Sequence, residues 1–370
     1  MNHSVNLLAA ALRDPPSIAR WSRADLTLLL QQARRANLLA RLHTVLVGLS
    51  VWPDLPEELR CHLESEFTYA DAQARAIRWE VACIRDAVRE TGVPVILLKG
   101  AAYVIADLPP AEGRIFSDVD ILVPKEALGQ VEQALFRRGW VTTHADPYDQ
   151  RYYRQWMHEL PPLRHVRRDT VLDVHHNILP ETAAVHPDAA KIIAEAVAIA
   201  TDPGLKVLAP ADMLLHSATH LFFDGELENG LRDLVDIDAL LRLFSSRDPD
   251  FWDLVVARAA ELDLSRPLFY ALRYCSQILG TPVPASAIAA VRSGRPVAPV
   301  LSVMDGLFLR GLAPDHPSCD RPLTRAARWL LYARAHKLRM PLHLLIPHLV
   351  RKAIMRRFSP GPREAREEKA

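Results

Sequence analysis

The sequence predicts an α+β protein in which a small mixed sheet is flanked by N-terminal and C-terminal helical regions. Apolar residues recur at three- and four-residue spacing in the first quarter, short apolar runs bounded by Gly or Pro follow, and helical periodicity then returns. We expect an N-terminal helical region over 1–92, a core over 93–185, a C-terminal helical domain over 186–320 and a basic tail over 321–370.

Bulk properties favour a cytoplasmic protein. The 370-residue chain is long enough to bury a large core without disulfides, and its four cysteines show no Cys-x-x-Cys spacing. The apolar run Val5–Leu12 lacks a basic flank and a small-residue cleavage site. No later run reaches about 18 uninterrupted apolar residues, so we expect neither secretion nor membrane insertion.

Positive charge is concentrated at the C-terminal end. Residues 321–370 contain thirteen Lys or Arg and three Glu, although the formal net charge of the whole chain is +1. The segment holds two basic amphipathic stretches, the second interrupted by Pro347, and ends in a charged stretch over 360–370. Most such basic tails are simply the solvated faces of helices. The alternative interpretation is that 321–357 makes a peripheral contact with an anionic membrane or another polyanion.

The core begins with a strand, a tight turn and a helix. Helical periodicity stops at Gly92, the residue type that ends helices. The apolar run Pro94–Leu98 predicts a strand, Lys99 and Gly100 a turn, and 101–106 the start of a helix.

The pattern then alternates between strands and helices. Phe116–Val123 predicts a strand and 125–138 an amphipathic helix. The runs 159–166 and 170–178 predict a hairpin, in which Pro161 and Pro162 confine the first strand to an edge or a bulge. Beyond residue 187 the periodicity predicts helices alone, including 210–222, 231–244, 251–262 and 266–279.

Two acids occupy alternate positions of the second predicted strand. Asp118 and Asp120 therefore point to one face, about 6 to 7 Å apart at Cα, while Val119 and Ile121 face the core. Carboxylates held this close repel each other unless a cation lies between them, and such pairs bind Mg²⁺. Polar residues at this spacing are also common on ordinary strands. If repulsion dominates, Asn at either position should leave the fold intact or slightly more stable.

A third acid lies in the apolar strand predicted around residues 171–175. Asp173 and His175 share one face of that strand, and burial of a lone Asp is unfavourable. The unfavourable term is removed if Asp173 joins Asp118 and Asp120 around two metal ions, an arrangement suited to in-line attack at phosphorus. Asp173 is then both a metal ligand and the proton acceptor for the nucleophile.

The turn between the first strand and its helix is a candidate phosphate site. Backbone N–H groups and the helix dipole favour anions there, and Gly100 permits close approach, although most such glycines simply bend the chain. Lys99 either neutralises phosphate or is solvated. Arg114 binds a triphosphate or pairs with Asp118.

These segments resemble the DNA polymerase β-like nucleotidyltransferase superfamily and, within it, a largely uncharacterised bacterial family. Across about residues 94–180, in this order, the resemblance rests on 97–102 (Leu-Leu-Lys-Gly-Ala-Ala), on Arg114 with 117–123 (Ser-Asp-Val-Asp-Ile-Leu-Val), on 158–163 (His-Glu-Leu-Pro-Pro-Leu) and on 172–175 (Leu-Asp-Val-His).

The resemblance implies a nucleotidyltransferase core that binds a nucleoside triphosphate (ATP or another NTP) and two Mg²⁺ ions. It implies transfer of a nucleoside monophosphate to a hydroxyl of a protein, a small molecule or a nucleic-acid end. Catalytic and metal roles then fall to Asp118, Asp120 and Asp173, and nucleotide binding to Lys99, Gly100, Arg114 and His175. Superfamily enzymes usually have Gly-Ser at the turn, where this chain has Gly100-Ala101. The alternative is a catalytically degenerate fold that acts as a nucleotide-binding or scaffolding module.

A second cluster of titratable residues is predicted on the following helices. Asp212, His216 and His220 recur at four-residue spacing and form a conceivable metal site. A structural lock, with His220 or Arg232 paired to Asp236 between two helices, is the alternative that we favour.

Overall fold

The computed structural model describes residues 6–143, 146–225 and 227–358, so the last part of the expected tail, 359–370, lies outside the described residues. The strands are β1 (Val95–Leu97), β2 (Val119–Leu122), β3 (Trp140–Thr142), β4 (Leu163–His165), β5 (Val171–His175), β6 (Val197–Ile199) and β7 (Asp202–Val207). The helices up to the last strand are α1 (Leu7–Arg13), α2 (Arg23–Arg35), α3 (Leu39–Leu46), α4 (Glu57–Val88), α5 (Lys99–Ile105), α6 (Leu128–Arg137), α7 (Pro147–Trp156) and α8 (Ala189–Ala194). Those after it are α9 (Pro210–Asp224), α10 (Gly230–Arg247), α11 (Phe251–Glu261), α12 (Ser265–Tyr274), α13 (Ala285–Ala290), α14 (Ala298–Gly311), α15 (Thr324–Arg339) and α16 (Leu342–Phe358).

The strands of the described chain form one mixed sheet in the order β3-β4-β5-β2-β1-β7-β6. β2 runs parallel to β5 and antiparallel to β1, and β1 runs parallel to β7. The outer pairs β3–β4, β4–β5 and β6–β7 are antiparallel. The expected α+β class is confirmed, and β2 and β5 lie at the interior of the sheet.

Residues with left-handed backbone conformation end several elements. Gly92, with φ of 69°, follows the turn that closes α4, where a side chain would be strained. Gly139, with φ of 95°, separates α6 from β3. Asn37, with φ of 52°, lies between α2 and α3.

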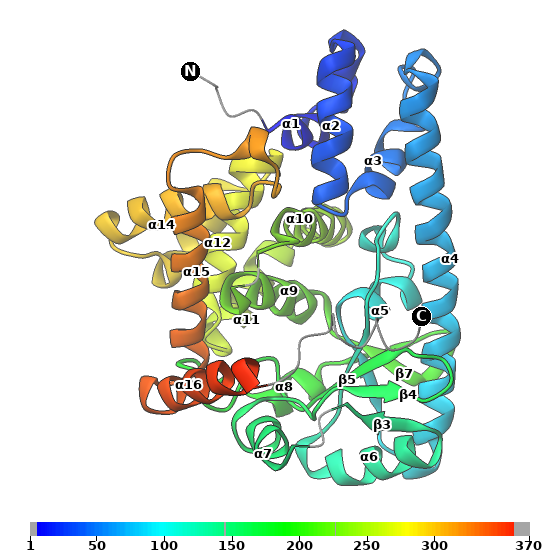
Figure 1. Ribbon diagram of the computed structural model, residues 1–370, viewed down its shortest axis with the longest axis vertical. Coiled ribbons are helices and arrows are strands. Elements are labelled where there is room, and N and C mark those ends of the chain that lie inside the picture. Colours follow the sequence, from blue (N-terminus) through cyan, green and yellow to red (C-terminus); the bar gives the residue numbers. More distant parts are fainter. Residues whose placement is uncertain (1–5, 144–145, 226, 359–370) are drawn as a thin grey trace.

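Helices cover the sheet and extend the molecule beyond it (Figure 1). The long α4 packs against α3, α5 and α6, while α9 packs against α10, α11, α12 and α15. A continuous hydrophobic core extends from Leu8 in α1 to Leu331 in α15. The regions expected from the sequence therefore share one core, and the boundaries between them stay a prediction.

The hairpin β6–β7 corrects the expectation that the chain beyond residue 187 is purely helical. β7 pairs in parallel with β1 and so extends the sheet. Its sequence includes Pro203 and Gly204, which are rare in strands, and Val197 in β6 is half exposed. The local pattern therefore carries no strand signal, and the open edge of β1 provides the pairing.

Part of the basic tail is built into the core. In α15, Leu331 is 2 % exposed, and Arg334 donates a hydrogen bond to the carbonyl of Phe222. The following turn and α16 pack against α7 through Met340 and Leu345. Within the described ranges, no helix combines the length and the apolarity that a bilayer span requires.

Candidate active site

The acids predicted for the site lie together at two neighbouring strands. The parallel register of β2 and β5 places Asp120 opposite Asp173. Asp118 lies two residues before Asp120, and His175 lies two residues after Asp173. Because alternate residues of a strand share a face, Asp120, Asp173 and His175 project from the same side of the sheet. Asp118 directly precedes β2 and lines the same pocket as Asp120.

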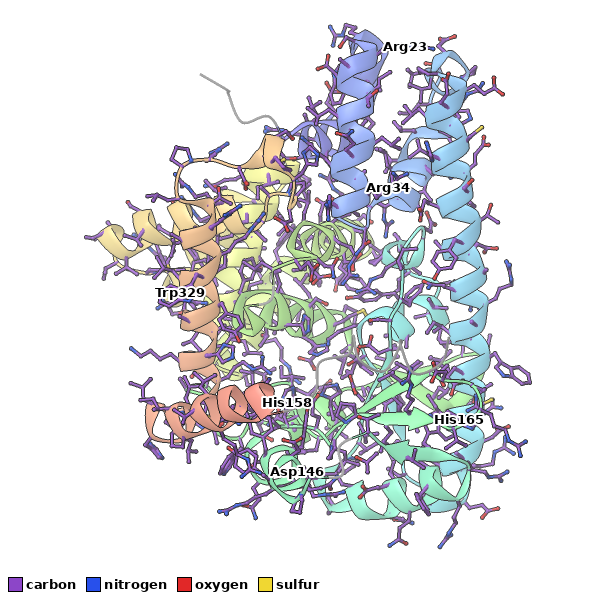
Figure 2. All side chains as sticks on the ribbon, viewed as in Figure 1. Arg23, Arg34, Asp146, His158, His165 and Trp329 are labelled. Carbon is purple, nitrogen blue, oxygen red and sulfur yellow. The ribbon has the colours of Figure 1, made fainter. Side chains whose placement is uncertain are left out.

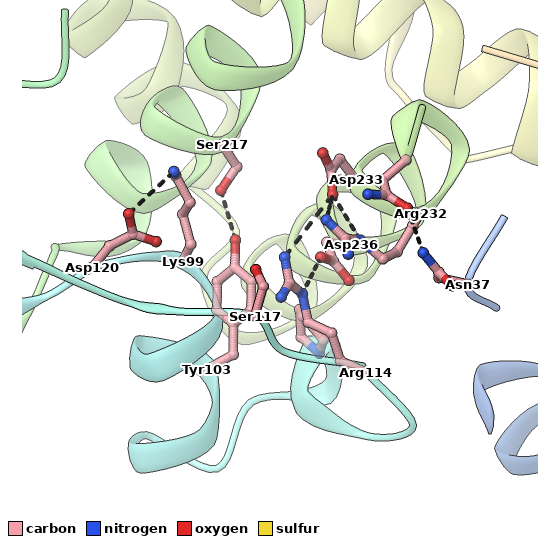
Figure 3. Close-up of polar contacts among 12 residues, drawn as sticks. Asn37, Lys99, Tyr103, Arg114, Ser117, Asp120, Ser217, Arg232, Asp233 and Asp236 are labelled. Atoms are coloured by element: carbon pink, nitrogen blue, oxygen red, sulfur yellow. Dashed lines mark hydrogen bonds and ion pairs between the residues drawn. The ribbon is translucent and has the colours of Figure 1, made fainter. Parts of the chain in front are cut away.

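Asp120 is 7 % exposed and is held by two cationic partners. Its Oδ1 accepts a hydrogen bond from His175 Nε2 at 3.0 Å. The same oxygen lies 3.5 Å from Lys99 Nζ (Figure 3). Burial raises the pKa of Asp120, but the Lys99 charge and the His175 hydrogen bond outweigh burial and hold that pKa well below its usual range. Asp120→Asn therefore removes an ion pair with Lys99. The sequence-based expectation that this change only relieves repulsion between carboxylates, and so leaves the fold intact or more stable, does not fit this geometry.

Asp173 lies in a different electrostatic environment. Burial, and next the charge of Asp120, raise the pKa of Asp173 to about 7. Its Oδ1 is buried and has no hydrogen-bond partner among the described residues. An unpaired buried oxygen is unfavourable, so this oxygen is available to a cation.

Both ring nitrogens of His175 face carboxylates. Nδ1 lies 3.3 Å from Glu159 Oε2, and Nε2 contacts Asp120. Burial lowers the pKa of His175, but the hydrogen bond with Asp120 and the charge of Glu159 outweigh burial and raise it. His175 therefore orients Asp120, and this geometry gives no support to the nucleotide contact predicted for it.

Lys99 and Gly100 lie where β1 passes into α5, as expected. Lys99 has φ of 41°, which is uncommon for a residue with a side chain. A Cβ on Gly100 would lie 2.8 Å from Phe116 Cδ1 and 2.9 Å from Arg114 Nη1. Packing therefore requires glycine at position 100, independently of any phosphate.

Arg114 connects the loop before β2 to the helical region. Its Nε donates to Asp236 Oδ2 at 2.7 Å, and its Nη2 lies 3.9 Å from Asp233 Oδ1 (Figure 3). Burial lowers the pKa of Arg114, but the two carboxylates outweigh burial and raise it. Arg41 Nη2 lies 3.8 Å from the other oxygen of Asp236. The pairing with Asp118 considered from the sequence is wrong, because Arg114 reaches α10 instead.

The partners of Asp236 include Arg114 and Arg41, whereas Arg232, one of its two expected partners, pairs with Asp233. Arg232 donates to its neighbour Asp233, and Asp236 is bound by arginines that are distant in sequence. Asp212, the carboxylate of the metal site considered on α9, is held by Arg258 at 2.7 Å. Helical spacing identified the buried acids, but their partners depend on long-range packing.

A pocket of about 300 Å³ lies between this end of the sheet and helices α9 and α10. Tyr103 and Ser217 join its two sides, with 2.7 Å between their hydroxyl oxygens (Figure 3). Its lining comes from the core (Lys99, Gly100, Tyr103, Arg114, Ser117, Asp118, Asp120) and from the helical region (Ser217, His220, Glu228, Asn229, Arg232, Asp233, Asp236). Its volume is at the lower end for small-molecule sites, and its lining is strongly charged.

Two site residues, His158 and Glu159, had no role predicted from the sequence. Both belong to the segment 158–163, whose resemblance to the family was the one sequence feature that could have indicated them. The structure brings them to His175. The contact between Tyr103 and Ser217 left no signal, because the two residues are far apart in the sequence.

The structure is an α+β protein with a mixed sheet, in which Asp120 on β2 lies opposite Asp173 on its parallel neighbour β5 and Asp118 directly precedes β2. A family model described as "Uncharacterised nucleotidyltransferase" matches residues 22–280. The match covers most of the chain, and the chain belongs to this family. Comparisons with curated proteins and with solved structures gave no match.

Proposed function

We propose that the protein transfers a nucleoside monophosphate from a nucleoside triphosphate to a hydroxyl group, with release of pyrophosphate, in a metal-dependent reaction. The observation that carries this proposal is the register that places Asp120 opposite Asp173, together with a charged pocket that Asp118 and Asp120 line. Membership of a nucleotidyltransferase family supports the reaction class.

The donor set fits magnesium. Mg²⁺ prefers carboxylate oxygens together with substrate phosphates. The Oδ1 of Asp173 is buried without a partner among the described residues, and the contacts of Asp120 with Lys99 and His175 both use its Oδ1. We assign Asp118, Asp120 and Asp173 as ligands of two ions, which when bound supply Lewis-acid charge stabilisation and a template for the phosphates.

The acidic strands also provide a proton acceptor. A carboxylate positioned beside the attacking hydroxyl can act as a general base. In the proposed reaction Asp173 takes the proton of the attacking hydroxyl. The hydroxyl oxygen forms a bond to the α-phosphorus as the bond from that phosphorus to pyrophosphate breaks. His175, itself contacted by Glu159, keeps Asp120 oriented.

Phosphate charge is proposed to be neutralised from the turn at α5. Lys99 lines the pocket with its side chain 20 % exposed. A cation and backbone N–H groups placed there stabilise charge that spreads over the phosphoryl oxygens in the transition state. Arg114 lines the same pocket, but because it pairs with Asp236 we assign it a structural role in the pocket lining rather than a contact with phosphate.

A nucleotide-binding or scaffolding module without turnover is the second candidate. The observation that favours it is the turn itself: Ala101 occupies the position where superfamily enzymes usually have a phosphate-binding serine, and Ala101 is 1 % exposed. In that case the pocket binds nucleotide but no group is transferred.

The deciding experiment is mass spectrometry of candidate acceptors after incubation with each of the four NTPs and Mg²⁺, together with measurement of pyrophosphate. We expect pyrophosphate release that requires Mg²⁺. Its rate should fall by a factor on the order of 10² to 10⁴ in Asp173→Asn, because this variant lacks the proton acceptor. Asp118→Asn and Asp120→Asn should abolish it. Asp71→Asn, an exposed acid on α4, is the matched control and should change nothing.

The outcomes separate the two candidates. Nucleotide that raises the thermal midpoint without any pyrophosphate release would favour the binding module. If neither turnover nor nucleotide binding depends on the three acids, the proposed site is wrong and the family assignment alone remains.

We further propose that the C-terminal helices contact an anionic lipid surface. Large apolar side chains are exposed on α15 and α16. Among them, Trp329 is 65 % exposed (Figure 2) and Ile346 is 57 % exposed. Residues 321–358 contain several Lys and Arg and no Asp or Glu. Exposed apolar groups beside basic charge favour a lipid interface over a purely polyanionic partner.

A further inference from the structure

Three ligand-type side chains form a cluster next to the acidic strands. His158 and Glu159 lie between α7 and β4, and His175 ends β5. One potential ligand atom from each residue lies within 4.8 Å of those of the other two. Ligands of one ion lie about 3 to 3.5 Å apart, so any wider contact in the cluster must shorten when an ion binds.

The backbone fixes the two segments against each other. Glu159 and His175 form an antiparallel bridge, the N–H of His176 donates to the carbonyl of His158 at 2.8 Å, and the N–H of Leu160 donates to the carbonyl of Val174 at 2.9 Å. The cluster therefore does not depend on a long loop. Pre-positioned ligands on such a scaffold lose little conformational freedom when an ion binds.

One ring nitrogen of the cluster has no partner among the described residues, and a second lies beside a carboxylate. The Nδ1 of His158 is buried and has no hydrogen-bond partner within the described chain. His175 donates its Nε2–H to Asp120, which leaves its Nδ1 facing Glu159 Oε2 at 3.3 Å. A metal ion bound between this nitrogen and the carboxylate takes the place of a proton there.

The surroundings resemble those of bound metals. Histidine ligands commonly donate their other ring N–H to a carboxylate, which fixes the tautomer and raises ligand basicity. Asp120 has that relationship to His175. Two imidazoles and one carboxylate suit Zn²⁺ and related transition ions, with one position left open, whereas Mg²⁺ prefers oxygen.

We propose that His158, Glu159 and His175 bind a divalent transition-metal ion of the Zn²⁺ class, at a site separate from the three-carboxylate site. An ion at this position fixes the ring of His175 and, through it, the carboxylate of Asp120. His158 and Glu159 are then positioning residues for Asp120. The proposal concerns binding and does not require nucleotidyl transfer.

Titration of the chelator-treated full-length protein with Zn²⁺, and with Co²⁺ as a spectroscopic probe, tests the site. We expect one ion per chain, the intense visible absorption of low-coordinate Co²⁺, and no displacement by millimolar Mg²⁺. His158→Gln and Glu159→Gln should each weaken Zn²⁺ binding by about 100-fold or more, and Asp120→Asn by about 10- to 100-fold as an outer partner. His62→Gln, which alters an exposed histidine, is the control and should have no effect.

Circular dichroism and thermal unfolding of each variant show whether it is folded, and a conservative Glu159→Asp variant should recover part of the affinity. Equal Zn²⁺ affinity in wild type, His158→Gln and Glu159→Gln would overturn the proposal. So would loss of the ion in Asp118→Asn but not in His158→Gln, because the ion would then occupy the carboxylate site. Absence of Zn²⁺ binding would overturn the proposal as well.

Discussion

Asp120 and Asp173 lie directly opposite each other on the parallel strands β2 and β5, yet Lys99 and the Nε2 of His175 both contact Asp120. Asp120 is therefore the ionised member of the pair, with its pKa lowered. Burial and the charge of Asp120 disfavour the ionised form of Asp173 and raise its pKa to about 7.

The first prediction concerns Asp173→Asn in metal-free protein. In the unfolded chain Asp173 ionises near its usual pKa of 3.8 and in the folded protein near 7. Between these values the folded state binds a proton that the unfolded state does not, so wild type loses stability as the pH rises from about 4 to about 7. Asp173→Asn removes this loss and should raise the free energy of unfolding at pH 8 by on the order of 2 kcal/mol.

Urea unfolding in EDTA at pH 5 and pH 8 measures this effect. The advantage of Asp173→Asn should shrink at pH 5, and Asp120→Asn should be less stable than wild type at both pH values. Lower stability of Asp173→Asn at pH 8 would show that its carboxylate is a structural group.

The second prediction separates packing from phosphate binding at Gly100. Gly100→Ala places a Cβ within 3 Å of Phe116 and Arg114, so it should destabilise the protein by about 1–3 kcal/mol even without nucleotide. The matched control is Gly129→Ala in α6, where a Cβ meets nothing within 4 Å and helix propensity favours Ala by up to about 1 kcal/mol. Chemical denaturation measures both, and unchanged stability of Gly100→Ala would contradict the packing explanation.

The third prediction concerns Asp236, which binds Arg114 and lies near Arg41. Removing one partner of a buried ion pair leaves the others uncompensated, so Asp236→Asn should lower the free energy of unfolding by about 3 kcal/mol or more. Asp71→Asn, in an exposed pair with Arg75, should lower it by no more than about 1 kcal/mol. A double-mutant cycle between Asp236 and Arg114 should give a coupling energy well above that of the surface pair.

The fourth prediction tests the lipid contact without deleting the tail, because Leu331 anchors α15 in the core. Trp329→Ala and Ile346→Ala should weaken sedimentation with phosphatidylserine-containing vesicles several-fold and change stability little. Trp79→Ala, which removes a tryptophan on α4 that is 67 % exposed, is the control. Binding should weaken as salt increases, since exposed charges are screened over about 8 to 10 Å at physiological ionic strength. Equal binding of all variants would exclude this surface.

The sequence by itself determined the α+β class and the strands that carry the acids. Strand periodicity places Asp118 and Asp120 on one face because a β-strand repeats every two residues, a local rule that needs no tertiary information. The ends at Gly92 and Gly139 were equally readable, since a left-handed residue has a local steric cause. The resemblance to a nucleotidyltransferase family was readable for the same reason, because its motifs are contiguous.

Tertiary structure decided the partners. The pairing of β2 with β5 makes Asp120 and Asp173 neighbours, and no local pattern specifies which strands pair. Arg114 meets Asp236 across the boundary between the sheet and α10, and β7 becomes a strand because β1 has an open edge. Ion pairing and burial depend on groups that lie far apart in the chain, so the tertiary structure decides which acid is ionised and which cation is already paired.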